Sequence, residues 1–122
     1  MRLKSIAPQF VVPDVARAAE HYRDKLGFEI LGYFPKPPVF AMVRRDGIEI
    51  HFGKSVSGRA APGSTHRDEG LDAYIWVDDV DALAAELKTR GADILEGPVQ
   101  RPYGRREIIV RDPNGFRLAF GQ

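Results

Sequence analysis

The chain has 122 residues, of which 43% are hydrophobic and 29% are charged, the balance of a soluble globular domain. Its 18 Lys and Arg residues against 17 Asp and Glu residues leave a net charge of +1, which argues against a nucleic-acid-binding protein that depends on overall basicity. The absence of cysteine excludes disulfides, thiolate metal ligands and cysteine nucleophiles.

The apolar runs are of strand length, so we expect no transmembrane helix. The first residues, Met1–Lys4, lack the apolar core of a secretory signal. From these two observations we expect a cytoplasmic protein that does not associate with membranes.

The first half of the chain predicts a strand, a helix and three further strands. The apolar run Ile6–Val12 is typical of a strand, and Asp14 is a candidate N-cap for the helix that follows. Apolar residues then recur at helical spacing from Val15 to Leu26, and Gly27 is placed to end the helix. The three later strands are expected at Glu29–Phe34, Val39–Arg44 and Gly47–Phe52.

Residues 54–70 are rich in Gly, Ser, Ala and charged residues and have no periodicity, so we interpret them as a flexible connector. A connector of this length could let the two halves pair across a dimer. His66 within it could bind a metal or lie on the surface as an ordinary histidine.

The second half repeats the pattern of the first. Ala73–Val77 is a strand candidate, Asp78 or Asp79 is placed to cap a helix that begins at Val80, and Gly91 is placed to end it. The three later strands are expected at Asp93–Leu95, Glu107–Val110 and Phe116–Phe120.

Three pairs of similar segments occur in the same order and at nearly constant spacing, which indicates an internal duplication. The pairs are Val12–Val15 with Val77–Val80, Gly27–Leu31 with Gly91–Leu95, and Gly47–Gly53 with Gly115–Gly121. We therefore predict an α+β fold in which residues 1–122 form a single domain. This domain would contain two βαβββ modules, residues 1–53 and 71–122.

Two stretches resemble a known superfamily. The opening strand and helix at residues 8–28, and the closing run Pro102-Tyr103-Gly104-Arg105-Arg106-Glu107 with the turn Arg111-Asp112-Pro113-Asn114-Gly115, are similar to the glyoxalase, bleomycin-resistance and extradiol-dioxygenase superfamily. This superfamily is also called the vicinal-oxygen-chelate fold. The closing run resembles its bleomycin-resistance branch. The resemblance implies that the modules form a cupped mixed sheet and that the protein is a homodimer with shared sheets or a shared cleft.

The resemblance also implies four positions from which enzymes of the superfamily hold a divalent metal. The repeat assigns these positions to Ala7, His51, Asp72 and Ala119. Only His51 and Asp72 could bind a metal, whereas a catalytic ion generally needs three protein ligands. We therefore expect no metal or other cofactor. An irregular site that recruits Glu49 and Gln9 stays open as an alternative.

Strand alternation and the resemblance together predict the residues that line or rim the cup. The candidate ligand-binding residues are Gln9, Phe34, Phe40, Glu49, His51, Asp72, Tyr74, Trp76, Tyr103, Arg106 and Arg117. Such a lining combines aromatic faces with a few polar anchors, as small-molecule sites do. The aromatic residues could instead pack the core or a dimer seam, and Arg106 could form an internal ion pair with Glu107.

The leading hypothesis is a homodimeric, metal-independent protein of the bleomycin-resistance type that sequesters a small aromatic or cationic molecule. No catalytic residue is assigned. The resemblance implies that proteins which receive bleomycin are distinctly acidic, so a net charge of +1 indicates that the ligand need not be this drug. One alternative is a metal-dependent lyase, isomerase or dioxygenase of the glyoxalase type that uses His51 and Asp72. Another is a module that binds a protein through the rim of the cup.

Overall fold

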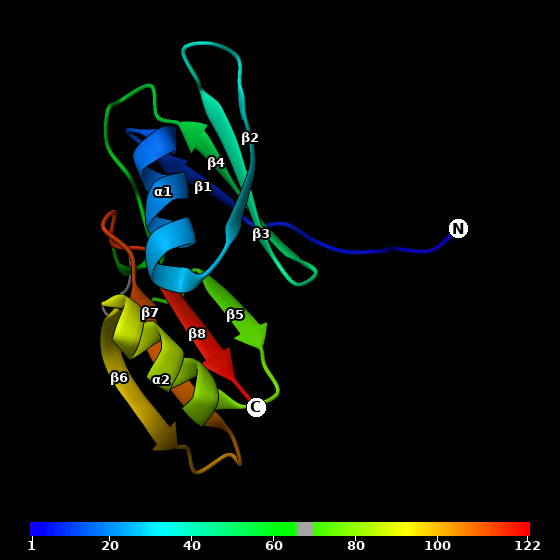
Figure 1. Ribbon diagram of the computed structural model, residues 1–122, viewed down its shortest axis with the longest axis vertical. Helices are drawn as coiled ribbons and strands as arrows, with labels where there is room; N and C mark the ends of the chain where they lie inside the picture. The colour runs from blue at the N-terminus through cyan, green and yellow to red at the C-terminus, as the bar shows by residue number, and fades with distance from the viewer. Residues whose placement is uncertain (66–69) are drawn as a thin grey trace. The chain divides into compact units, whose positions relative to one another are not determined.

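The structure, a computed structural model that describes residues 1–65 and 70–122, divides into two compact units. Unit 1 is Met1–Ala60 and unit 2 is Ala61–Gln122. Each unit has one strand, one helix and then three strands in chain order, which confirms the α+β class and the repeated βαβββ pattern (Figure 1).

Unit 1 contains a four-stranded mixed sheet with the spatial order β1-β4-β3-β2, in which β1 is parallel to β4 and the other neighbours are antiparallel. Its elements are β1 (Gln9–Val12), α1 (Val15–Leu26), β2 (Glu29–Phe34), β3 (Phe40–Arg45) and β4 (Ile48–Lys54). The first strand therefore lies at one edge of the sheet, paired with the last strand of its unit.

Unit 2 repeats this topology with the spatial order β5-β8-β7-β6 and the parallel pair β5 and β8. Its elements are β5 (Ala73–Trp76), α2 (Val80–Arg90), β6 (Asp93–Gln100), β7 (Arg106–Arg111) and β8 (Arg117–Gly121). A short 3-10 helix, η1 (Gly63–Thr65), precedes them in the predicted connector. His66 lies outside the described residues.

Both helices begin and end as the sequence predicts. The Asp14 side chain accepts a hydrogen bond from the Arg17 backbone N–H, and the Asp79 side chain accepts one from that of Ala82. Asp79, and not Asp78, is thus the N-cap of α2. Gly27 and Gly91 end the helices with φ of 75° and 79°, the left-handed conformation that glycine adopts most easily.

Each helix packs on one face of the sheet in its own unit (Figure 1). Tyr22 and Leu26 on α1 are fully buried, and so is Leu87 on α2. Burial of an apolar side chain of this size contributes about 2 kcal/mol to stability. The buried side chains on one face of each helix therefore hold that helix against its sheet. No helix among residues 1–65 and 70–122 is long and apolar enough to cross a membrane.

Two strands differ from the sequence prediction by more than two residues at one end. Strand β1 begins at Gln9 and not at Ile6, since Pro8 has no N–H to donate to a sheet. Strand β6 is eight residues long, far beyond the predicted Asp93–Leu95. It continues along β7 through two register shifts, and Gly97, with φ of 95°, lies at the second. A Cβ at Gly97 would overlap the Glu107 carbonyl oxygen, so only glycine fits there.

Candidate functional site

The candidate site lies in unit 2 and begins with Tyr74 on β5. Tyr74 pairs with Ala119 across the parallel ladder, in the same way that Gln9 pairs with His51 in unit 1. The Tyr74 hydroxyl reaches past Gly121 to the Glu107 carboxylate on β7, with a 2.7 Å hydrogen bond to Oε2. A Cβ at Gly121 would overlap this hydroxyl, so the contact depends on the absence of a side chain there.

The turn between β6 and β7 supplies a second tyrosine. The Arg101 N–H donates to the Arg105 carbonyl at 2.7 Å, and Gly104 adopts a φ of 85°, which closes the turn tightly. Tyr103 lies at the exposed end of this turn, and its hydroxyl turns back to donate a 2.8 Å hydrogen bond to Glu107 Oε1. The predicted turn thus carries an aromatic ring to the same carboxylate that Tyr74 contacts.

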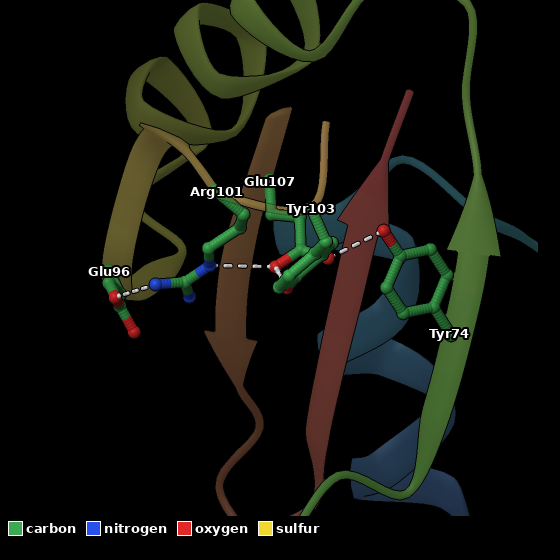
Figure 2. Close-up of polar contacts among 5 residues, drawn as sticks. All are labelled: Tyr74, Glu96, Arg101, Tyr103 and Glu107. Atoms are coloured by element: carbon green, nitrogen blue, oxygen red, sulfur yellow. Dashed lines mark hydrogen bonds and ion pairs between the residues drawn. The ribbon is translucent and has the colours of Figure 1, made fainter. Parts of the chain in front are cut away.

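Glu107 is the centre of a polar network that extends from β6 to β5 (Figure 2). Its side chain is only 5% exposed. Arg101 Nε donates to Glu107 Oε1 at 2.9 Å, and Arg101 Nη1 donates to Glu96 Oε1 at 2.7 Å. A buried carboxylate is tolerated when it is paired and hydrogen-bonded, and Glu107 meets both conditions.

The network shifts the pKa values of its members. Burial of Glu107 opposes ionisation, but hydrogen bonds from Tyr74, Arg101 and Tyr103 outweigh it and lower the pKa of this carboxyl group. Burial and the bond to Glu107 raise the pKa of Tyr74 to about 12. The bond to Glu107 is the main cause of the raised pKa of Tyr103. At neutral pH Glu107 is therefore an ionised carboxylate and both phenols are protonated.

A cavity of about 640 Å³ opens beside this network. Its apolar lining comes from Leu71, Leu95, Pro102 and Ile109. Its aromatic and charged lining comes from Tyr74, Glu96, Arg101, Tyr103, Glu107 and Arg117. The volume and the mixture of apolar walls with a few polar groups are typical of small-molecule sites.

Trp76 stands next to the cavity lining without belonging to it. Its ring lies 4.8 Å from the Tyr74 ring, centroid to centroid, and 61% of the residue is exposed. The Arg105 guanidinium lies over the Trp76 ring, with Cζ 4.5 Å from the ring centroid. Such an exposed indole can hold a cation or stack on a flat ring.

Asp72 has a structural role in unit 2. Its Oδ1 accepts from the Gly63 backbone N–H at 2.7 Å, and its Oδ2 accepts from the Arg117 backbone N–H at 2.9 Å. Both carboxylate oxygens therefore fix η1 to the start of β8. Among residues 1–65 and 70–122, no three His, Asp or Glu side chains form a group that could hold a metal ion.

Three of the predicted residues form a separate network in unit 1. His51 Nε2 lies 2.9 Å from Glu49 Oε1, and His51 Nδ1 lies 2.8 Å from Gln9 Nε2. A carboxylate only accepts hydrogen bonds, so Nε2 carries the proton and Nδ1 accepts from the Gln9 amide. Phe40 packs edge-on against the imidazole, with 5.6 Å between ring centroids.

The two remaining predicted residues lie elsewhere. Arg106 forms a bidentate ion pair with Asp81 at the start of α2, with distances of 2.7 and 2.9 Å. This pairing corrects the alternative in which Arg106 bonds to Glu107. Phe34 ends β2 of unit 1 and is half exposed.

Sequence reasoning overlooked Glu107, Arg101 and Glu96 as site residues. Glu107 could have been noticed because it is a charged residue directly before three apolar residues of β7, all of which are buried. Arg101 lies in the turn that follows β6 and forms its ion pair with Glu107 at 2.9 Å.

The chain matches the family model described as the Glyoxalase/Bleomycin resistance protein/Dioxygenase superfamily over residues 2–120. It is 25% identical to an uncharacterized protein of Mycobacterium bovis, over 97% of this chain and 82% of that protein. It is 27% identical to the bleomycin-binding protein of bleomycin-producing Streptomyces verticillus, solved with copper(II)-bleomycin; the match covers 98% and 96% of the chains with a TM-score of 0.71. It is 26% identical to TnmS3, an antibiotic-binding protein of Streptomyces sp. CB03234, over 100% and 98% of the chains with a TM-score of 0.69.

Proposed function

The chain belongs to the Glyoxalase/Bleomycin resistance protein/Dioxygenase superfamily, and from this premise we propose that it sequesters a small aromatic molecule, neutral or cationic, without a metal ion. The similarity to a bleomycin-binding protein and to an antibiotic-binding protein supports a binding role. The ligand enters the cavity of unit 2 and contacts the rings of Tyr74 and Tyr103.

The observation that carries this proposal is the cavity itself. About 640 Å³ is ample for a molecule of three fused rings, and the walls offer two phenol rings and four apolar side chains. Phenol rings bind flat aromatic ligands by stacking and by edge contacts. The polar groups of the lining then fix the orientation of the ligand.

The roles of the metal-position residues support a metal-independent function. Asp72 uses both carboxylate oxygens on backbone N–H groups, and a metal would have to displace these bonds. His51 uses both ring nitrogens on Gln9 and Glu49. Ala7 and Ala119 have no donor atom in their side chains.

One observation favours a second candidate, a metal-dependent enzyme of the glyoxalase type. In unit 1 the Glu49 carboxylate orients the His51 imidazole, an arrangement that also occurs behind metal-binding histidines. Elemental analysis of protein purified without chelator separates the two candidates. A stoichiometric divalent metal that is lost in His51→Ala would replace the binding proposal with the enzymatic one.

The partners and location expected from the sequence stay predictions. These are a homodimer and a cytoplasmic protein that binds neither nucleic acid nor membranes. The ligand-binding roles expected for Gln9, Glu49 and His51 also stay predictions, because the proposed cavity is formed by residues of unit 2.

The proposal is tested by titration of the protein with 9-aminoacridine, a flat three-ring cation. The chain has one tryptophan, Trp76, whose ring lies 4.8 Å from that of Tyr74, so its fluorescence reports on this side of the cavity. We expect saturable quenching with micromolar affinity, weakened about tenfold or more in Tyr103→Ala because a stacking face is lost.

The matched control is Tyr33→Ala on β2 of unit 1, which removes another partly exposed tyrosine from a place outside the cavity. This variant should bind 9-aminoacridine like the unaltered protein. Absence of saturable quenching at millimolar concentrations of the probe, or equal weakening by both substitutions, would contradict the proposed site.

A further inference from the structure

The direction of the hydrogen bonds around Glu107, that is, which group donates and which accepts, restricts the ligands that can bind at the end of the cavity formed by this residue. The Glu107 carboxylate accepts three hydrogen bonds, from Tyr103 and Arg101 at Oε1 and from Tyr74 at Oε2. An ionised carboxylate has no proton to give, so every partner must be the donor. The direction of each O–H bond in the network is thereby fixed.

The two phenols consequently face the cavity as acceptors. The hydroxyl hydrogens of Tyr74 and Tyr103 both point at Glu107, which leaves the lone pairs of both oxygens for other partners. The raised pKa values of both tyrosines keep these hydrogens in place at neutral pH. Glu107 Oε2 has accepted one bond and has the capacity for a second.

Arg101, the cation of this network, is already paired with two carboxylates. Its Nε donates to Glu107 and its Nη1 donates to Glu96, so its charge is balanced within the protein. Besides the N–H groups that Arg101 has left, this end of the cavity presents two phenol oxygens and the carboxylates of Glu96 and Glu107, which accept hydrogen bonds and give the network a net charge of −1.

The backbone of Arg117, the second arginine of the lining, lies at the other end of β8 from Gly121. Glu107 pairs with Gly121 of β8, whereas Arg117 pairs with Arg111. Four residues along a strand separate Arg117 from Gly121, a distance of roughly 13 Å. A ligand group that contacts the Glu107 carboxylate is thus remote from the Arg117 backbone position.

We propose that the Glu107 end of the cavity selects ligands that donate hydrogen bonds, such as phenols, aromatic amines and ring N–H groups, and excludes the same ring systems when they carry a carboxylate. This inference rests on the proposed function, since it concerns the same cavity. Tyr74 and Tyr103 contact the ligand directly. Arg101 is a positioning residue that holds the Glu107 carboxylate.

The inference is tested with three probes that share a naphthalene ring system and differ in the group attached to it. 2-Naphthol has a hydroxyl hydrogen, 2-methoxynaphthalene has the same ring system without it, and 2-naphthoate carries a carboxylate. Isothermal titration should show that 2-naphthol binds about tenfold or more tightly than 2-methoxynaphthalene, since a hydrogen bond to a charged acceptor is the stronger kind. 2-Naphthoate should bind most weakly of the three.

Glu107→Gln tests the origin of this preference. The amide has the shape of the carboxylate but donates through its nitrogen, so one tyrosine hydroxyl must reverse and point its hydrogen into the cavity. The preference for 2-naphthol should then fall several-fold, and 2-naphthoate should gain affinity. Tyr103→Phe provides a second variant that keeps the buried ion pair of Glu107 with Arg101, and it should reduce the preference for 2-naphthol in the same direction.

The possible failures are distinguishable. Equal binding of 2-naphthol and 2-methoxynaphthalene, or a preference unchanged in Tyr103→Phe, overturns the donor requirement and leaves the aromatic-binding function in place. Tighter binding of 2-naphthoate than of 2-naphthol overturns it as well. Failure of the naphthalenes and of 9-aminoacridine to bind overturns the proposed function, and this inference with it.

Discussion

Gly121 and Gly53 occupy equivalent positions in the two units, yet their surroundings differ. Gly121 ends β8 and lies under the Tyr74 hydroxyl, whereas a Cβ at Gly53 of β4 would meet no atom within 4 Å. Gly53 pairs with Phe40, and Gly121 pairs with Glu107. The requirement for glycine is therefore local to the hydrogen bond between Tyr74 and Glu107.

Gly121→Ala should break that hydrogen bond, because the new methyl group takes the place of the Tyr74 hydroxyl. The pKa of Tyr74 should fall from about 12 towards its ordinary value of 10. The measurement is the phenolate absorbance as a function of pH, read as the difference from Tyr74→Phe. Gly53→Ala is the matched control and should leave the titration curve unchanged; an equal change in both variants would contradict the role of Gly121.

The residues of the site were predictable where strand alternation or the superfamily resemblance applied. Tyr74, Tyr103 and Arg117 were expected at a ligand site, and the structure places all three in the cavity lining. The alternative pairing of Arg106 with Glu107 is wrong, because neighbouring residues on a strand point to opposite faces. Arg106 accordingly reaches Asp81 on α2, and Glu107 faces the cavity.

The helical elements follow from local sequence signals. Capping aspartates, apolar spacing and terminal glycines predicted α1 and α2, because each signal acts within one or two turns of the chain. Strand β6 was predicted too short because its continuation depends on β7. Its two register shifts lie between Ile94 and Glu96 and between Glu96 and Val99.

Asp79→Ala should destabilise unit 2 by about 1 kcal/mol, since the Ala82 N–H at the start of α2 loses its acceptor. Asp78→Ala is the matched control, because this exposed neighbour has the same charge and does not cap the helix. Urea unfolding followed by circular dichroism measures both changes. A loss from Asp78→Ala as large as that from Asp79→Ala would show that charge, and not capping, stabilises the helix.

Over the whole molecule, the duplication explains why fold was easier to predict than function. Both units have the same strand order and the same parallel pairing of first and last strands. The side chains at equivalent positions have diverged, with Gln9 and His51 in unit 1 against Tyr74 and Ala119 in unit 2. The duplication gives both units the same backbone topology, whereas the side chains on each sheet face have changed independently.

Although the net charge of the molecule is close to zero, several of its carboxyl groups have lowered pKa values. Arg106 lowers the pKa of Asp81, Arg101 lowers that of Glu96, and Arg23 lowers that of Asp24. These three groups are exposed, so solvent screens their ion pairs. Glu107 is the buried member of this set, so its protonation should contribute more to the acid sensitivity of the molecule than that of the three exposed groups.

A folded-state pKa below the ordinary value of 4.5 means that ionised Glu107 adds stability above pH 4.5. That contribution is lost as the pH falls through the lowered pKa, because protonation removes the negative charge that pairs with Arg101 and strengthens the hydrogen bonds from Tyr74 and Tyr103. We therefore expect the free energy of unfolding in urea to be nearly constant between about pH 7 and 5 and to fall at more acidic pH. Glu107→Gln should be less stable at pH 7 and should show a smaller acid-induced fall. Asp24→Asn, which neutralises an exposed carboxylate in the same way, should retain the full fall, and an equal flattening in both variants would contradict a contribution specific to Glu107.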